Sequence, residues 1–204
     1  MRARLTLASA AALTATLTLA LLPTAALAHP AIGDAHGFMH GFAHPLNGLD
    51  HVLAMVTVGI FAWRLGGRAL WLVPGTFVAV MALGGLAGMA GIGVAGVEIG
   101  VAASVIVLGA IVALGVKPPV AIAMGIVALF AVFHGHSHGT EMPLDIAGAA
   151  YAAGFMLATA LLHVAGIALG MLIGRIGDAY GRLGYRVSGA LVALAGFAIL
   201  AHAI

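Results

Sequence analysis

Six apolar segments, each about 20 residues long, follow one another along this chain and constrain its fold more than any other feature. A segment of that length crosses the hydrocarbon layer of a bilayer as an α-helix, because a helix satisfies its own backbone hydrogen bonds there. Hydrophobic residues make up 63% of the 204 positions and charged residues 7%, against about 25% charged in soluble domains. The sequence therefore predicts an all-α, polytopic membrane protein. The segments span residues 45–65, 69–89, 97–116, 118–138, 146–174 and 187–204.

Residues 1–28 have the pattern of a cleaved secretory signal peptide: Arg2 and Arg4, a long apolar run, and small residues at Ala26 and Ala28. An uncleaved signal anchor is the alternative, because the apolar run is long. Removal of the signal peptide leaves a polar, histidine-containing segment, 29–43, and a six-helix transmembrane bundle, 44–204. The histidines of the polar segment either belong to a flexible tail or collect metal weakly.

Basic residues mark the topology of the bundle. They flank the first, third and fifth links between the apolar segments, whereas the second and fourth links contain none. The positive-inside rule assigns the basic side to the cytoplasm, so both mature termini are expected in the periplasm of a bacterial inner membrane protein. The first segment then starts outside and the fourth ends outside. Two clusters of histidine and acid, one at each of these points, are expected in the same outer half of the membrane.

The first cluster is HPLNGLDH, residues 44–51. Proline fits the first position of a helix, so we expect the first membrane helix to begin at His44 or Pro45. His51 then lies about two turns below His44, with Gly48 between them on the same side. Asp50 either ligates an ion or holds an imidazole in its ligating tautomer.

The second cluster is FHGHSHGTEMP, residues 133–143. His134 and His138 are four residues apart and Glu141 follows three later, so a continuing helix places them on one face, with His136 pointing elsewhere. Imidazole and carboxylate ligands suit divalent nickel, cobalt, zinc, copper or iron. Glu98, near the outer end of the third segment, either joins the ion path or reaches to the membrane interface.

Several classes of protein are excluded. The chain has no cysteine, which excludes disulfides, thiolate metal sites and iron–sulfur clusters. It contains no nucleotide-binding motif, so no ATP hydrolysis is expected. The excess of basic residues is explained by membrane topology, and no nucleic acid partner is expected. Glycines at small-xxx-small spacing, such as Gly84 with Gly88 and Gly166 with Gly170, are expected to let helices pack closely.

A family resemblance rests on the two clusters. HPLNGLDH matches the pattern His-x5-Asp-His, and FHGHSHGTEMP matches Phe-His-Gly-x-x-His-Gly-x-Glu-x-Pro, which are typical of the HupE/UreJ family of nickel/cobalt permeases. The resemblance implies a secondary transporter, not an enzyme, that imports Ni2+ or Co2+ as substrate for metalloenzymes such as hydrogenase or urease and holds no permanent cofactor. Its functional positions correspond here to His44, Asp50, His51, His134, His138 and Glu141, with Glu98 resembling the acid of the third helix.

Other functions are left open by the residues themselves. The sequence GHSHG, 135–139, satisfies the G-x-S-x-G pattern of hydrolases, but that motif needs a strand-to-helix elbow and an apolar helix precedes it here. Histidines on two helices can also bind haem, and a metal sensor or chaperone would use the same ligands. His163 and His202, isolated in apolar segments, are expected to be ordinary hydrogen-bonded residues.

Overall fold

The computed structural model describes residues 34–142 and 146–203, which form seven α-helices and no strand, so the all-α prediction is confirmed. The predicted signal peptide, 1–28, and His29 lie outside the described residues. Five helices are long and apolar enough to cross a membrane, and a sixth span results when one bent pair of helices is counted as a single span. The chain is thus a multi-pass membrane protein.

The bent pair is the first part of the chain that the structure describes. Helix α2 (Asp34–Asn47) and helix α3 (Leu49–Leu65) meet at Gly48 with an angle of 82° between them. The expected start of a membrane helix at Pro45 is wrong, because Pro45 lies in the last turn of α2. His44 and His51 consequently lie on two helices of different direction, and not one above the other on a single helix.

The five remaining helices agree closely with the apolar segments. They are α4 (Ala69–Met89), α5 (Val97–Leu114), α6 (Val120–Thr140), α7 (Ile146–Arg175) and α8 (Asp178–Ala203). One detail differs from the sequence-based expectation, because α8 begins nine residues before Val187. Helix α7 is continuous through Gly154 and Gly166.

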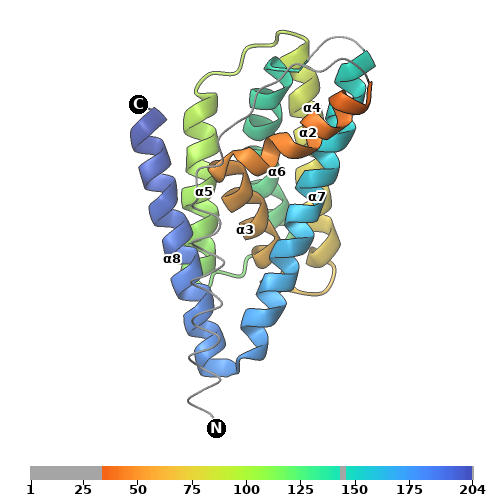
Figure 1. Cartoon of the computed structure of the whole chain (residues 1–204). Helices are drawn as coiled ribbons and strands as arrows, with labels where there is room; N and C mark the ends of the chain where they lie inside the picture. The colour runs from red at the N-terminus through yellow and green to blue at the C-terminus, as the bar shows by residue number, and fades with distance from the viewer. Residues whose placement is uncertain (1–33, 143–145, 204) are drawn as a thin grey trace. The chain divides into compact units, whose positions relative to one another are not determined.

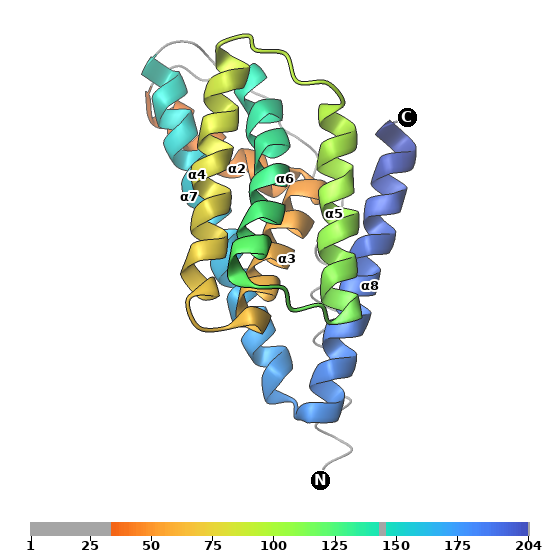
Figure 2. The same cartoon turned by 180° about the vertical axis from the view of Figure 1, so that it is seen from behind.

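Helix α3 lies in the middle of the bundle, against α7, α5 and α4 (Figures 1 and 2). The closest pairs are α4 with α6, α5 with α8, and α2 with α7. Glycines allow this proximity: a Cβ on Gly84 would meet the carbonyl of Val132, and one on Gly166 would meet the carbonyl of Val56. The expected packing role of these small residues is confirmed.

The helices alternate in direction and so define two ends of the bundle (Figure 1). We call the end where α3, α5 and α7 begin the histidine end, and the end where they finish the arginine end. All basic residues of the described part lie in the links or helix termini at or near the arginine end: Arg64, Arg68, Lys117, Arg175, Arg182 and Arg186. The predicted alternation of links with and without basic residues is therefore present in the fold.

The bundle is apolar both inside and outside. Its core contains Met55, Phe61, Phe77 and Leu108, each at most 1% exposed. Many large apolar side chains, among them Trp71 at 76% exposed, face outward. An outer surface of this kind is stable in lipid, where apolar groups replace water as neighbours.

Candidate metal centre

The two predicted clusters meet at the histidine end. Helix α2 carries His44, α3 begins with His51 in its first turn, and α6 carries His134 and His138 in its last two turns. Glu141 caps the C-terminal end of α6. The bend between α2 and α3 turns α2 across this end of the bundle, which brings the first cluster onto the second (Figure 1).

Three residues form what we call the outer set: His44, His138 and Glu141. One ligand atom from each lies within 4.8 Å of the other two. His44 Nε2 is 3.0 Å from His138 Nδ1 and 3.6 Å from Glu141 Oε2. Ligands that bind one transition-metal ion at about 2.0–2.1 Å are themselves about 2.9–3.4 Å apart. The two imidazoles therefore have the spacing of ligands to one divalent transition metal, and the Glu141 carboxylate lies somewhat further away with a suitable donor chemistry.

The imidazoles continue from the outer set into the interior. His138 Nε2 is 3.1 Å from His51 Nδ1, which in turn is 3.2 Å from His134 Nδ1. We call His44, His138, His51 and His134 the imidazole file. Exposure falls along it, since His51 is 1% exposed and His134 is fully buried. A polar side chain at that depth in a membrane protein needs partners, and here each ring is the partner of the next.

Ser104 on α5 ends the file and fixes its proton arrangement. The Ser104 hydroxyl donates to the carbonyl of Val101 at 2.6 Å, so its oxygen accepts the Nε2–H of His134 at 2.8 Å. His134 then has its lone pair on Nδ1, facing His51 Nδ1. His51 completes the pattern by donating from Nδ1, which leaves its buried Nε2 with no partner among the described residues.

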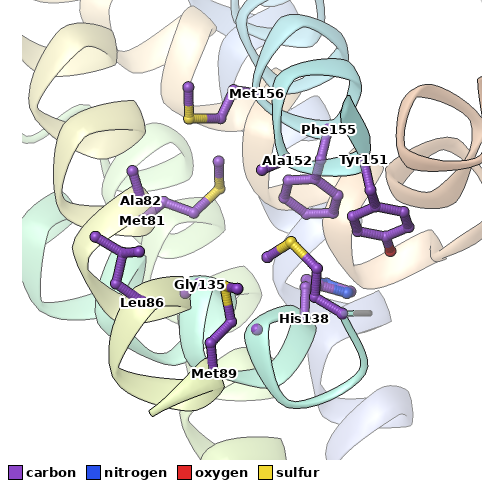
Figure 3. A pocket seen from close by; sticks show the side chains of 13 residues that line it. Met81, Ala82, Leu86, Met89, Gly135, His138, Tyr151, Ala152, Phe155 and Met156 are labelled. Atoms are coloured by element: carbon purple, nitrogen blue, oxygen red, sulfur yellow. The ribbon is translucent and has the colours of Figure 1, made fainter. Parts of the chain in front are cut away.

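Aromatic rings and thioethers enclose the site. The ring centroid of Phe155 on α7 lies 4.7 Å from that of His138 and 5.3 Å from that of His51. Beside His138 is a cavity of about 230 Å³ between α4, α6 and α7 (Figure 3). Four methionines line it, Met81, Met89, Met142 and Met156. These apolar walls limit the access of water to the imidazoles from the side of α7.

Two of the acids singled out in the sequence are not part of the outer set. Asp50 lies in the first turn of α3, where its Oδ1 accepts the backbone N–H of His51 at 2.7 Å. A carboxylate at this position interacts favourably with the helix dipole. Glu98 lies exposed in the first turn of α5, also at the histidine end. Asp50 thus lies beside the imidazole file without contacting the ligand atoms of the outer set, and Glu98 lies on a different helix at the same end of the bundle.

Other residues considered in the sequence analysis lie outside the imidazole file. His136 is buried on another face of α6, where its Nε2 donates to the carbonyl of Ile92 at 2.7 Å. His40 packs edge-on against Tyr151, with ring centroids 5.6 Å apart. The G-x-S-x-G sequence at 135–139 is helical throughout, so the elbow that a hydrolase requires is missing there.

Comparison with known proteins tests the family resemblance. The sequence model of a family described as HupE / UreJ protein matches residues 17–199. The chain belongs to the HupE/UreJ family. Protein HupE of Rhizobium leguminosarum bv. viciae is 48% identical over 186 residues, which are 91% of this chain and 96% of that protein. No solved structure matches the chain. The prediction of the family from the two histidine motifs is therefore confirmed.

In this HupE/UreJ protein, sequence reasoning missed two residues of the site, Ser104 and Phe155, and made one wrong prediction about a residue outside it, His163. The sequence does contain a signal for Ser104, because it is the one hydroxyl side chain in the α5 segment and polar side chains in membrane helices often form hydrogen bonds to a neighbouring helix. Nothing in the sequence distinguishes Phe155 from the other aromatic residues. His163 was expected to be hydrogen-bonded, which is wrong: it is 1% exposed and neither ring nitrogen has a partner among the described residues.

Proposed function

We propose that this HupE/UreJ protein is a secondary transporter that imports Ni2+ or Co2+ across the bacterial inner membrane, with the arginine end in the cytoplasm. The observation that carries the proposal is the imidazole file, which joins the outer set to the buried interior through nitrogen–nitrogen distances of 3.0–3.2 Å. A resident structural metal would need only the outer set. A series of ligands that extends inward supports the passage of an ion.

Capture of the ion would begin at the histidine end. His44, His138 and Glu141 replace part of the hydration shell, and the carboxylates of Asp50 and Glu98 at the same end of the bundle make this end attractive to cations. Ligand exchange along His138, His51 and His134 then brings the ion below the surface of the bundle. Nickel and cobalt are both compatible with imidazole and carboxylate ligands, so the proposal includes both.

The membrane potential supplies sufficient energy for this uptake. A potential of about 100 mV, negative inside, contributes about 2.3 kcal/mol per charge, or about 4.6 kcal/mol for a divalent ion. That free energy supports an accumulation of more than about a thousandfold. No ATP hydrolysis is required, in agreement with the lack of a nucleotide-binding motif in the sequence. Supply of the metal to hydrogenase or urease is the biological role that the family membership suggests.

Haem binding is the strongest alternative, and the geometry disfavours it. Two axial imidazoles on opposite sides of a haem iron have their nitrogens about 4 Å apart, with the macrocycle between the rings. Here the nitrogens of neighbouring rings are in direct contact at 3.0–3.2 Å. An absorption spectrum of the purified protein tests this directly, because bound haem gives a Soret band.

The decisive experiment is the uptake of radioactive Ni2+ or Co2+ into liposomes that contain only this protein. His51→Ala and His138→Ala are expected to abolish uptake, because each interrupts the imidazole file. His202→Ala is the matched control, since His202 is exposed near the end of α8, away from the file. Metal uptake by both file variants at the rate of the parent would refute the proposal, and so would a parent protein that binds metal but carries none.

A further inference from the structure

His163 on α7 is a buried imidazole that the imidazole file does not use. Its side chain is 1% exposed, and both Nδ1 and Nε2 lack a hydrogen-bond partner among the described residues. A buried polar group without a partner destabilises the fold by about 1–3 kcal/mol. Such groups are uncommon in native proteins and call for an explanation, such as a ligand or ion that the group binds.

The position of His163 continues the file toward the arginine end. Its carbonyl is adjacent to Gly59 of α3, which lies eight residues beyond His51 and hence about 12 Å further along that helix. The ring of Phe77 packs against both His134 and His163, with centroid distances of 5.7 Å and 5.3 Å. A single aromatic ring therefore contacts both His163 and the last imidazole of the file.

On its other side, His163 lines a groove of about 430 Å³ between α4 and α7. The other lining residues are apolar, and Trp71 and Val164 among them are exposed at the outer surface of the bundle. Leu70 and Trp71 belong to the first turn of α4 at the arginine end. Among the residues that the structure describes, His163 is thus the one titratable side chain of a groove that extends toward the opposite end.

We propose that His163 is an inner ligand for the transported cation, occupied after His134 and before release at the arginine end. This inference rests on the proposed function. A site with one imidazole binds a divalent transition metal more weakly than the outer set, with its two imidazoles and one carboxylate. Weak binding at His163 favours release of the cation. The cation passes beside the Phe77 ring when it moves from His134 to His163.

Two measurements on the full-length protein test the proposal: equilibrium binding of Co2+ and influx of Co2+ into proteoliposomes. His163→Leu is expected to bind Co2+ as the parent does, because the outer set is intact, while its influx falls about tenfold or more. His202→Leu, the matched control, is expected to keep both properties. His163→Cys is expected to raise the ratio of Cd2+ to Co2+ influx, because a thiolate is a softer ligand than imidazole.

The outcomes separate this inference from the proposed function. If the parent carries Co2+ and His163→Leu carries it equally well, His163 is not a ligand on the path, and the proposed function is unaffected. A simultaneous loss of Co2+ binding and influx in His163→Leu, or an unchanged Cd2+ to Co2+ ratio in His163→Cys, assigns His163 a packing role and also overturns the inference. A parent without Co2+ influx overturns both proposals.

Discussion

Removal of the Ser104 hydroxyl is the most informative perturbation of the site, because Ser104 binds no metal itself. In the parent it accepts the Nε2–H of His134 at 2.8 Å, and both side chains are fully buried. In Ser104→Ala this donor has no acceptor, which costs about 1–3 kcal/mol. The ring avoids the cost by moving its proton to Nδ1, the nitrogen that faces His51. The lone pair then points away from the ion path.

The expected consequence is weaker metal binding. Loss of a hydrogen bond that orients a ligating histidine lowers metal affinity about 10- to 100-fold. This range corresponds to about 1.4–2.8 kcal/mol, which agrees with the cost of the unpaired donor. Co2+ suits the assay, because its visible absorption reports both the affinity and the number of nitrogen ligands. We expect a higher dissociation constant for Ser104→Ala and slower Co2+ influx into proteoliposomes.

Ser188→Ala is the matched control for this experiment. Ser188 loses the same hydroxyl, but its hydrogen bond, 3.2 Å to the carbonyl of Tyr185, lies within α8 and apart from the histidines. Its Co2+ affinity is expected to equal that of the parent. If Ser104→Ala also binds Co2+ within about twofold of the parent, the proton arrangement that we assign to His134 is wrong.

Three further predictions concern the outer set, its protonation and the helix packing around it. Glu141→Gln removes the carboxylate from the outer set and is expected to weaken Co2+ binding about tenfold in the same titration; equal affinity would exclude Glu141 as a ligand. Imidazole binds metal only in its neutral form, so Co2+ affinity is expected to fall as the histidines become protonated below about pH 6.5, and an affinity that stays constant down to about pH 3 would argue against histidine ligation. Gly135→Ala places a Cβ against the carbonyl of Met81 and is expected to lower the thermal unfolding temperature in detergent, whereas Gly125→Ala, in open space on the same helix, is not; equal melting of the two variants would contradict the close packing of α4 and α6.

The fold was largely predictable because lipid imposes one rule on every span. The length of the apolar segment alone predicted the bounds of α4, Ala69–Met89, as the structure has them. The bend at Gly48 was not predictable in this way. Pro45 fits the first turn of a helix by its missing N–H, but the packing of α2 on α7, where Gly41 meets Tyr151 and Gly154 meets Phe38, favours a separate helix before it. A tertiary contact of this kind leaves no periodic signal in the sequence.

The early start of α8 has a similar explanation. The residues before Val187 include basic and polar side chains, so their hydropathy does not indicate a membrane segment. The structure nevertheless continues the helix back to Asp178, after a turn in which Gly177 has a φ of 102°. The Tyr185 hydroxyl then donates to the carbonyl of Gly170, which holds the start of α8 against α7. Helix extension beyond the apolar segment is therefore a matter of packing at the arginine end.

The site was predictable in outline and not in detail. The links with basic residues predict that both histidine motifs lie at the same end, and in the structure His44 Nε2 is 3.0 Å from His138 Nδ1. The sequence does not reveal which nitrogen of each ring faces which neighbour, because that depends on the angle between α2 and α3. For the same reason Asp50, adjacent to His51 in the chain, interacts with a backbone N–H and not with an imidazole.

The position of His138 in two contacts at once has a chemical consequence. Its Nδ1 faces His44 and its Nε2 faces His51, yet a neutral imidazole has a single lone pair. In the transport that we propose, the ring therefore binds one cation at a time, and two adjacent cations cannot share it. A cation that advances from the Nδ1 side to the Nε2 side is bound again only after the ring loses its proton at Nε2 and gains one at Nδ1. The path of the metal thus depends on proton exchange between His138 and its neighbours.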